Sequence, residues 1–302
     1  MFNVANKSHT YRVAKAQAIV NIHPDTSKLI REGRSPKGDI VESARVSATL
    51  GAKKTWDLIP YCHPIPLDHI NTQVIVKSEC IEVEVEVKSI WKTGVEMEAL
   101  TGACIGALTI YDMLKPVDNS ISISSVKLLN KSGGMKDFSE NGKRRLRAAV
   151  IVISDSVARG KRQDKSGKYT VQKLQEIGID VVEYIVVPDD SNIIEDHLKK
   201  YCDDIHADLI LTTGGTGIGP RDVTPEATKK ILEKELRGIS EGTRAYGQQR
   251  TPLSMFSRGL AGLRGSTLIV NMPGSLKGVS ESLDFLFPGI EHAFNMMEGQ
   301  SH

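Results

Sequence analysis

The first half of the chain combines strand patterns with helix patterns. Residues 81–88 alternate apolar and charged side chains with the period of two that is typical of a strand with one wet face. With residues 71–77 before it, this segment predicts an antiparallel hairpin. Residues 39–42 have the spacing of a capping box and predict a helix that runs to about Lys54. A long apolar helix over residues 95–114 would cover the other face of the sheet, so we expect an α+β domain.

The second half alternates strands and helices with the regularity of a parallel sheet. Short apolar runs predict four strands, and each is followed by a segment with helical character. The strands are expected at residues 148–153, 181–187, 209–211 and 267–270, and the helices from Tyr169, from Asn192, from Thr224 and beyond Gly278. This order predicts an α/β domain with a doubly wound, mostly parallel sheet.

The ends of these four strands share one kind of chemistry. They carry Asp155, residues 188–190, a glycine-rich loop with Asp222, and residues 272–275. Turns alone would also use Asp, Pro and Gly. Ligands of doubly wound sheets collect outside the carboxyl ends of the strands, however, so the convergence of all four ends favours a ligand site there.

The glycine-rich loop is the most informative of these ends. Residues 209–226 read as a buried strand, a loop with four glycines and the start of a helix. We expect Thr224 to be the N-cap and Pro225 the first helical residue, which would let backbone N–H groups bind phosphate. The loop matches neither the P-loop nor the usual dinucleotide-binding pattern. Arg221 and Asp222 would suit a nucleotide with Mg²⁺, whereas a tight turn explains the glycines alone equally well.

Length and composition bound the class of protein. A chain of 302 residues has room for about two domains. Its hydrophobic content of 40%, charged content of 25% and net charge of +2 are typical of a soluble globular protein rather than a strongly nucleic-acid-binding one. We expect neither a signal peptide nor a membrane span. None of the four cysteines forms a Cys-x-x-Cys pair, which is typical of free thiols in the cytoplasm.

A polar, glycine-rich and basic stretch at residues 131–147 separates the two halves. We expect a first domain over residues 1–138, a linker over residues 139–146 and a second domain over residues 147–302. A short basic run in the linker is usually just solvated, so we do not assign it to nucleic-acid recognition.

Prolines bracket His63 and would hold its imidazole in one place. Adjacent side chains of an extended segment point in opposite directions, so we do not expect Cys62 and His63 to form a catalytic pair. Neither has a second histidine or cysteine at zinc-ligand spacing. We interpret His63 as a ligand contact, with a structural role as the alternative.

Charged side chains of the long predicted helix form a second candidate group. Glu98 and Asp112 are about four turns apart and fall near one stripe, and Lys115 lies on the same side as Asp112. Carboxylates and a lysine there suit proton transfer, although an ordinary ion pair explains the spacing of Asp112 and Lys115 as well. Lys37 precedes the helix at Asp39, where a cation could meet a phosphate.

Taken as whole strings, five segments resemble the MoaC family, cyclic pyranopterin monophosphate synthase. They are residues 37–39 (KGD), 53–64 (KKTWDLIPYCHP), 92–101 (KTGVEMEALT), 107–113 (ALTIYDM) and 131–134 (KSGG). The resemblance covers about residues 1–136. It implies conversion of 3′,8-cyclo-7,8-dihydro-GTP into cyclic pyranopterin monophosphate with loss of pyrophosphate. We expect a ferredoxin-like fold for this domain, with an antiparallel sheet and helices.

The resemblance to MoaC also implies site residues. Asp112 would be the catalytic carboxylate, and Lys115 and Lys37 would carry protons or clamp phosphate. Arg12 would hold the triphosphate. The residues expected to line the substrate site are Tyr61, Cys62, His63, Met97, Glu98 and Lys131.

The second half resembles the MogA/MoaB family, which binds molybdopterin. The matching segments are residues 154–156 (SDS), 163–165 (QDK), 188–189 (PD), 212–227 (TTGGTGIGPRDVTPEA) and 272–274 (MPG). The resemblance implies Mg²⁺-ATP-dependent adenylylation, in which the terminal phosphate of molybdopterin attacks the α-phosphate of ATP. Asp189 and Asp222 would be the catalytic carboxylates, with Mg²⁺ near them. The expected substrate contacts are Gly214, Gly215, Thr216, Gly217, Arg221, Pro273, Gly274 and Ser275.

Two alternatives stay open for the second half. It could be a molybdopterin-binding or assembly module without catalysis, or a nucleotidase or pyrophosphatase on a related fold. The attached first domain argues against the nucleotidase. The two resemblances together imply a bifunctional enzyme of molybdenum cofactor biosynthesis with pterin and nucleotide substrates. They also imply a homo-oligomer based on hexamers or trimers, without nucleic-acid or membrane partners.

Overall fold

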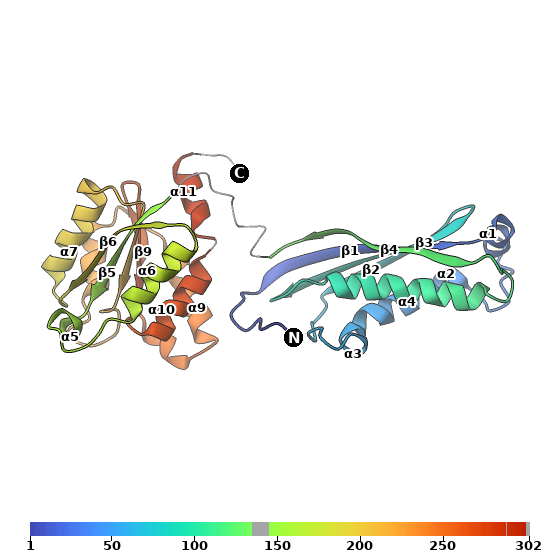
Figure 1. Ribbon diagram of the computed structural model, residues 1–302, viewed down its shortest axis with the longest axis horizontal. Helices are drawn as coiled ribbons and strands as arrows, with labels where there is room; N and C mark the ends of the chain where they lie inside the picture. The colour runs from blue at the N-terminus through green and yellow to red at the C-terminus, as the bar shows by residue number, and fades with distance from the viewer. Residues whose placement is uncertain (135–144, 288, 300–302) are drawn as a thin grey trace. The chain divides into compact units, whose positions relative to one another are not determined.

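The chain forms two compact units, Met1–Asp137 and Phe138–His302, in a computed structural model that describes residues 1–134, 145–287 and 289–299 (Figure 1). Positions 139–144 of the expected linker, with most of its basic run, lie outside the described residues. Each unit has a hydrophobic core of its own, formed by one cluster in the first unit and by two in the second.

The N-terminal unit is a four-stranded sheet with helices on one face. The strands follow the order β2-β3-β1-β4, and all neighbours are antiparallel. β2 and β3 form the hairpin expected from the alternating pattern. The elements are β1 (Thr10–Asn21), α1 (Pro24–Arg31), α2 (Ile40–Lys53), α3 (Thr55–Leu58), β2 (His69–Val76), β3 (Cys80–Trp91), α4 (Glu96–Leu114) and β4 (Ser122–Ser132).

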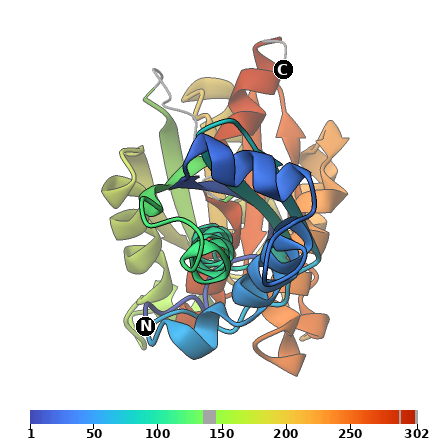
Figure 2. The same cartoon turned by 90° about the vertical axis from the view of Figure 1, so that its right-hand side faces the viewer.

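The two long helices of this unit begin where the sequence predicts. Asp39 is the N-cap of α2, and its side chain accepts a hydrogen bond from the N–H of Glu42 (2.9 Å). α4 begins one residue after the expected start and ends at the expected Leu114. Figure 1 shows α2 and α4 on the same face of the sheet, and Figure 2 views α4 nearly end-on beneath the strands.

Small residues let α4 approach α2 and the sheet closely. A Cβ atom at Gly102 would lie 2.9 Å from the carbonyl oxygen of Ala48 in α2. A Cβ atom at Gly106 would lie 2.8 Å from Cγ1 of Val83 in β3. Any larger side chain at these positions would push α4 away from both partners.

α4 is long and apolar enough to cross a membrane by length and composition only, which is weak evidence by itself. It packs against α2 and the sheet, however, and 56% of its apolar window is buried inside the structure. The same test is passed by the core helix of a globular unit, which is what these contacts indicate.

The C-terminal unit is a six-stranded sheet in the order β6-β5-β7-β10-β9-β8. β6, β5, β7 and β10 are parallel, as expected, and β9 and β8 extend the sheet in antiparallel fashion. The elements are β5 (Arg147–Ile153), α5 (Asp155–Ala158), α6 (Ser166–Glu176), β6 (Asp180–Val187), α7 (Ser191–Lys199), the π-helix Lys200–Asp204, β7 (Leu209–Thr213), α8 (Thr224–Ile231), β8 (Lys234–Glu235), α9 (Arg237–Gln248), the 3₁₀-helix Pro252–Phe256, β9 (Ala261–Arg264), β10 (Thr267–Met272), α10 (Leu276–Leu286) and α11 (Glu291–Met297).

Both faces of this sheet are covered. Along β5, Ala148 and Val150 belong to one hydrophobic core, whereas Ala149 and Ile151 belong to another. Side chains alternate between the two faces of a strand, so each core lies on its own face. This explains why the strands read as continuous apolar runs rather than as alternating patterns.

The predicted N-cap of α8 is wrong. α8 begins at Thr224 with Val223 as its N-cap and without a side-chain cap. The Thr224 hydroxyl instead donates a hydrogen bond to the carbonyl oxygen of Gly214 (3.0 Å), at the start of the glycine-rich loop. Pro225 lies in the first turn, as expected. The tertiary contact to the loop therefore replaces the local cap.

We expect Gly102→Ala to lower the free energy of unfolding of the N-terminal unit by about 1 kcal/mol or more. Alanine favours a helix over glycine by about 1 kcal/mol, but the new methyl group would collide with the backbone of Ala48. Gly238→Ala in α9 is the control, because a Cβ atom there meets nothing within 4 Å. Thermal and denaturant unfolding of the full chain measures both. A Gly102→Ala protein as stable as wild type would contradict this account of the helix contact.

Candidate functional site

Lys37, Asp112 and Lys115 meet at the end of α4. Nζ of Lys37 lies 2.8 Å from Oδ2 of Asp112 and also donates to the Asp112 carbonyl oxygen (2.8 Å). Nζ of Lys115 lies 2.8 Å from Oδ1 of the same carboxylate. The i,i+3 spacing predicts the pair within the helix, whereas Lys37 comes from the loop before α2, 75 positions away. A carboxylate held between two ammonium groups is thus built into the fold.

The two ammonium groups determine the charge state of this cluster. Hydrogen bonds from Lys115 and Lys37 lower the pKa of Asp112 to about 2. The same contact with Asp112 raises the pKa of Lys115. All three side chains are at least one-third exposed, so the cluster is open to a ligand from solvent. At neutral pH it presents two protonated amines around one ionised carboxylate.

Glu98 lies near the other end of α4 and is buried, with only 3% of its surface exposed. Its Oε2 atom is buried without a hydrogen-bond partner among the described residues. Burial raises the pKa of Glu98 to about 7. Burial, together with the charge of Glu98, also raises the pKa of the Cys62 thiol. This carboxyl group can therefore gain or lose a proton near neutral pH.

The other predicted residues of the first site gather around this same end. Arg12 donates to the carbonyl oxygens of Trp91 (3.4 Å), Lys92 (3.5 Å) and Gly133 (3.1 Å). Lys131 forms an ion pair with Glu96 in the first turn of α4 (3.0 Å). Arg12 thus ties the end of β3 to the end of β4.

His63 and its neighbours present their side chains differently. A ring nitrogen of His63 lies 2.9 Å from the carbonyl oxygen of Phe2. Cys62 instead lies near Glu98, whose charge contributes to the raised pKa of the thiol. Tyr61 and Met97 are exposed, 80% and 41% respectively.

The two groups of the first unit lie at opposite ends of one helix. Glu98 and Asp112 are fourteen positions apart, and a rise of about 1.5 Å per residue separates them by about 21 Å along α4. The single stripe expected to unite them for proton transfer therefore does not do so within one chain. The two groups are therefore separate within one chain.

The glycine-rich loop of the second unit exposes its backbone to a ligand. Gly214 and Gly215 have φ angles of +107° and +61°, which L side chains rarely adopt. The N–H groups of Gly215, Thr216, Gly217 and Ile218 donate no hydrogen bond to any described residue. Successive free N–H groups beside left-handed residues form a concave anion site.

Three carboxylates surround this loop. Asp189 Oδ2 accepts a hydrogen bond from the N–H of Asp155 (2.8 Å), and Asp222 Oδ2 accepts one from the N–H of Gly219 (2.7 Å). Burial raises the pKa of Asp189, and the charges of Asp155 and Asp222 add to this effect. Arg221 forms an ion pair with Asp155 (2.6 Å). The site therefore concentrates negative charge that a bound cation would neutralise.

A cavity of about 430 Å³ lies at the ends of β5 and β7. Successive strands are added on one side of β5 and then on the other, so the strand order reverses between β5 and β7. Ligands of such folds bind outside the strand ends at this switch point. The cavity is lined by Asp189, Gly214, Gly215, Asp222, Gly274 and Ser275 among the predicted residues. Thr216, Gly217, Arg221 and Pro273 are not among its lining residues.

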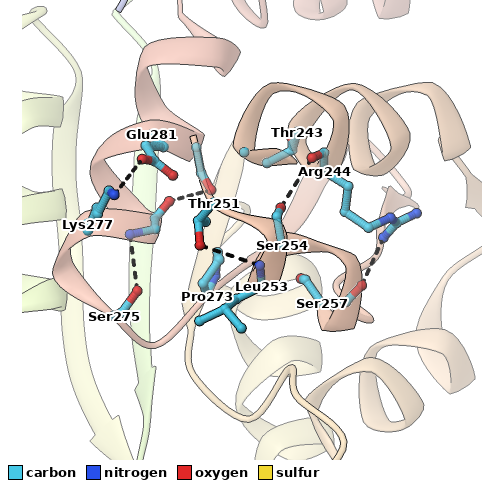
Figure 3. A pocket seen from close by; sticks show the side chains of 13 residues that line it. Thr243, Arg244, Thr251, Leu253, Ser254, Ser257, Pro273, Ser275, Lys277 and Glu281 are labelled. Carbon is cyan, nitrogen blue, oxygen red and sulfur yellow. Dashed lines mark hydrogen bonds and ion pairs between the residues drawn. The ribbon is translucent and has the colours of Figure 1, made fainter. Parts of the chain in front are cut away.

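A second cavity of about 380 Å³ lies beside the first, and Figure 3 shows hydroxyl and charged side chains around it together with Leu253 and Pro273. Pro273 and Ser275 line it together with residues of α9, the 3₁₀-helix and α10. Ser275 lines both cavities, and its hydroxyl oxygen accepts a hydrogen bond from the N–H of Gly278 as the N-cap of α10. Two neighbouring cavities could hold two parts of a ligand or two ligands.

Sequence reasoning missed residues that shape these cavities. Asp164 is buried and accepts hydrogen bonds from the side chains of Ser166 (3.1 Å) and Tyr184 (2.7 Å) and from two backbone N–H groups. These bonds hold residues 162–166, which line the first cavity. The sequence places Asp155 at a strand end but gives it no role. The α9 segment, part of which lines the second cavity, has Ile239 and Tyr246 seven positions apart, a spacing that could have indicated a helix.

Comparisons with known proteins agree with the two-unit organisation. The MoaC family model matches residues 1–134, and the family described as "Probable molybdopterin binding domain" matches residues 149–292. A solved structure of the molybdopterin biosynthesis enzyme MoaB from Thermus thermophilus is 42% identical to this chain. It has a TM-score of 0.49 and covers 51% of this chain and 97% of its own.

Named relatives match one half or the whole length. A cyclic pyranopterin monophosphate synthase of Thermomicrobium roseum is 46% identical over 136 residues, which are 44% of this chain and 82% of that protein. A molybdenum cofactor biosynthesis bifunctional protein of Chlorobaculum tepidum is 35% identical over 302 residues, which are 100% of this chain and 96% of the relative. Because this second similarity spans both units, the chain belongs to the family of molybdenum cofactor biosynthesis bifunctional proteins.

Proposed function

We propose that the N-terminal unit converts 3′,8-cyclo-7,8-dihydro-GTP into cyclic pyranopterin monophosphate and pyrophosphate. We further propose that the C-terminal unit adenylylates molybdopterin with Mg²⁺-ATP. The names of the relatives and the two family matches support these assignments. The observation that carries the first is the Lys37–Asp112–Lys115 cluster, and the observation that carries the second is the row of free N–H groups beside Asp189 and Asp222.

The lysine cluster has the charge that the first reaction needs. The substrate carries a triphosphate, and pyrophosphate leaves with additional negative charge. Two protonated lysines can bind that charge and give a proton to a leaving oxygen. The ionised Asp112 carboxylate keeps both ammonium groups oriented by its hydrogen bonds until substrate arrives.

The separation of these two groups of the first unit supports a homo-oligomer. Within one chain, Glu98 and Lys37 cannot reach one small substrate, because about 21 Å of helix lies between their ends of α4. Two copies packed with their α4 helices in opposite directions would bring the start of one helix to the end of the other. We propose that each complete N-terminal site combines Asp112 of one copy with Glu98 of another.

The two neighbouring cavities suit the two substrates of the second reaction. The first is lined by Gly214, Gly215, Asp189 and Asp222, which suit the phosphates and Mg²⁺ of ATP. The second combines Leu253 and Pro273 with serine and threonine hydroxyls, which suit the ring and the polar edge of a pterin. Ser275 lies where the two would meet. Transfer then depends on holding the attacking phosphate in line with the α-phosphate of ATP. Loop N–H groups and Arg221 would stabilise the negative charge that develops during this transfer.

The residues present fit Mg²⁺ bound together with a nucleotide. Asp189 and Asp222 each keep one carboxylate oxygen without a hydrogen bond among the described residues. No group of three or more metal-binding side chains occurs in the described part of the chain. Mg²⁺ typically takes only one or two carboxylates and completes its shell with phosphate oxygens and water. When bound, it would neutralise charge on the triphosphate.

A binding or assembly module without catalysis is the second candidate for the C-terminal unit. The same cavities would then hold molybdopterin without ATP turnover. Release of pyrophosphate from Mg²⁺-ATP in the presence of molybdopterin separates the two, because a module would bind the pterin and release none.

The two proposed activities belong to two separate domains. We infer that residues 1–138 and 147–302 are separate domains joined by the 139–146 linker, and that the first is ferredoxin-like. The element order β1-α-β2-β3-α4-β4 and the strand order β2-β3-β1-β4 support that fold. The described cysteines are all free, which supports the cytoplasm as the compartment.

Asp112→Asn is expected to lower formation of the cyclic pterin by about 100-fold or more, because it removes the charge that holds both lysines. Asp57→Asn is the matched control, since Asp57 is also an exposed partner of a lysine three positions away. Product formation by the full chain is measured for both, with circular dichroism to verify folding. Near-normal turnover in folded Asp112→Asn would refute the proposed site.

Asp222→Asn is expected to lower pyrophosphate release from Mg²⁺-ATP by about 100-fold or more. The amide oxygen can still accept the hydrogen bond of Gly219, so the loop should keep its shape while the charge is lost. Asp190→Asn, which caps α7 beside the site, should leave activity unchanged. Equal losses in both variants would show that the effect is not specific to Asp222.

Stability of the N-terminal unit should fall as pH rises from about 4.5 to about 7. The pKa of Glu98 is raised from 4.5 to about 7 in the folded chain, so the folded state binds more protons than the unfolded state across this window. The loss should be on the order of 2–3 kcal/mol. Glu98→Gln removes it, so the melting temperature of the variant should rise relative to wild type between these pH values. Parallel melting curves across the window would contradict the buried acid.

A further inference from the structure

Arg258 lies after the 3₁₀-helix, and both its backbone and its side chain donate hydrogen bonds to the glycine-rich loop. Its N–H donates to the carbonyl oxygen of Thr216 (2.8 Å), and its Nε donates to that of Gly217 (2.6 Å). Nη2 donates to the carbonyl oxygen of Asp222 (2.6 Å). Nη1 forms an ion pair with Glu226 in the first turn of α8. Arg258 thus joins residues 216, 217 and 222 of the loop to the first turn of α8.

The outer part of the loop depends on this residue. Within the described part of the chain, every hydrogen bond made by residues 216–218 goes to Arg258. The loop's other anchors act elsewhere: Thr224 holds Gly214 and Gly215, and the Asp222 carboxylate holds Gly219. Removing Arg258 would therefore release the loop between two intact anchors.

The direction of the bonds determines where the free N–H groups point. The C=O of one residue and the N–H of the next lie on opposite sides of a trans peptide. Arg258 draws the carbonyl oxygens of Thr216 and Gly217 toward itself, so the N–H groups of Gly217 and Ile218 are turned away from it. These are two of the N–H groups that have no partner among the described residues.

We propose that Arg258 is a positioning residue for the nucleotide site. It acts through the loop: it presents the N–H groups of residues 217 and 218 to phosphate and keeps Asp222 beside them. The planar guanidinium can serve several acceptors at fixed angles, which the single ammonium of lysine cannot reproduce. The proposal rests on the proposed adenylyl transfer for its consequence in catalysis, but its effect on the loop is independent of that reaction.

Arg258→Lys in the full chain tests this, with Arg264→Lys as the matched control. Arg264 also bonds a carbonyl oxygen, that of Ile231, and pairs with a carboxylate, Asp203, but it has no bond to the loop. Hydrogen exchange with mass spectrometry follows the bonded N–H groups of the loop, those of Gly219 and Asp222, together with the N–H of residue 258, which bonds Thr216 in the loop and is kept in the variant. Titration calorimetry measures Mg²⁺-ATP binding, and steady-state kinetics separates kcat from KM.

We expect faster exchange confined to the loop and about tenfold weaker Mg²⁺-ATP binding in Arg258→Lys, with neither change in Arg264→Lys. Glu226→Gln, which breaks the ion pair but leaves the three carbonyl contacts, should have a smaller effect on both. If Arg258→Lys does not fold, Arg258→Gln, which keeps an amide donor, takes the same measurements.

Unchanged loop exchange in a folded Arg258 variant would overturn the proposal, as would equal effects of Arg264→Lys. If the wild-type chain neither binds Mg²⁺-ATP nor releases pyrophosphate, the proposed adenylyl transfer fails instead. In that case the exchange measurement still decides whether Arg258 positions the loop.

Discussion

The close contact of α4 with α2 and the sheet determines where the chemistry of the first unit lies. Gly102 and Gly106 allow the helix backbone to approach Ala48 and Val83 to within side-chain contact, so α4 cannot shift or turn without a collision. Its two ends are then fixed in space. One end delivers Asp112 and Lys115 to the loop that carries Lys37, and the other end buries Glu98 next to Cys62.

Burial and exposure give the two carboxylates of α4 opposite behaviour. Asp112 is exposed between two lysines and loses its proton at about pH 2, whereas Glu98 is buried and holds its proton to about pH 7. One helix thus carries an ionised carboxylate and an acid that titrates near neutrality. This difference is typical of sites in which one group orients charge and another exchanges protons.

In the second unit, the loop after β7 presents backbone N–H groups at one edge of the sheet. Positive φ angles at Gly214 and Gly215 turn the chain sharply after β7 and leave successive N–H groups without partners among the described residues. Thr224 and Arg258 direct their donors to the loop carbonyl oxygens rather than to the ligand. The loop carbonyl oxygens are therefore hydrogen-bonded, whereas the N–H groups on the other side have no partner among the described residues.

The sequence by itself determined the local elements and the residue types of both sites. Apolar periodicity and capping signals located α2, α4 and the parallel strands, and the i,i+3 spacing predicted the pair of Asp112 and Lys115, because these features depend on neighbours along the chain. Only the tertiary structure decided the rest. It brought Lys37 to Asp112 across 75 positions and placed Glu98 and Asp112 at opposite ends of α4. It also bonded the Thr224 side chain to the loop rather than to its own helix, and Arg258 to the loop carbonyl oxygens. These contacts depend on how elements pack in space, and no periodicity or spacing along the chain records that.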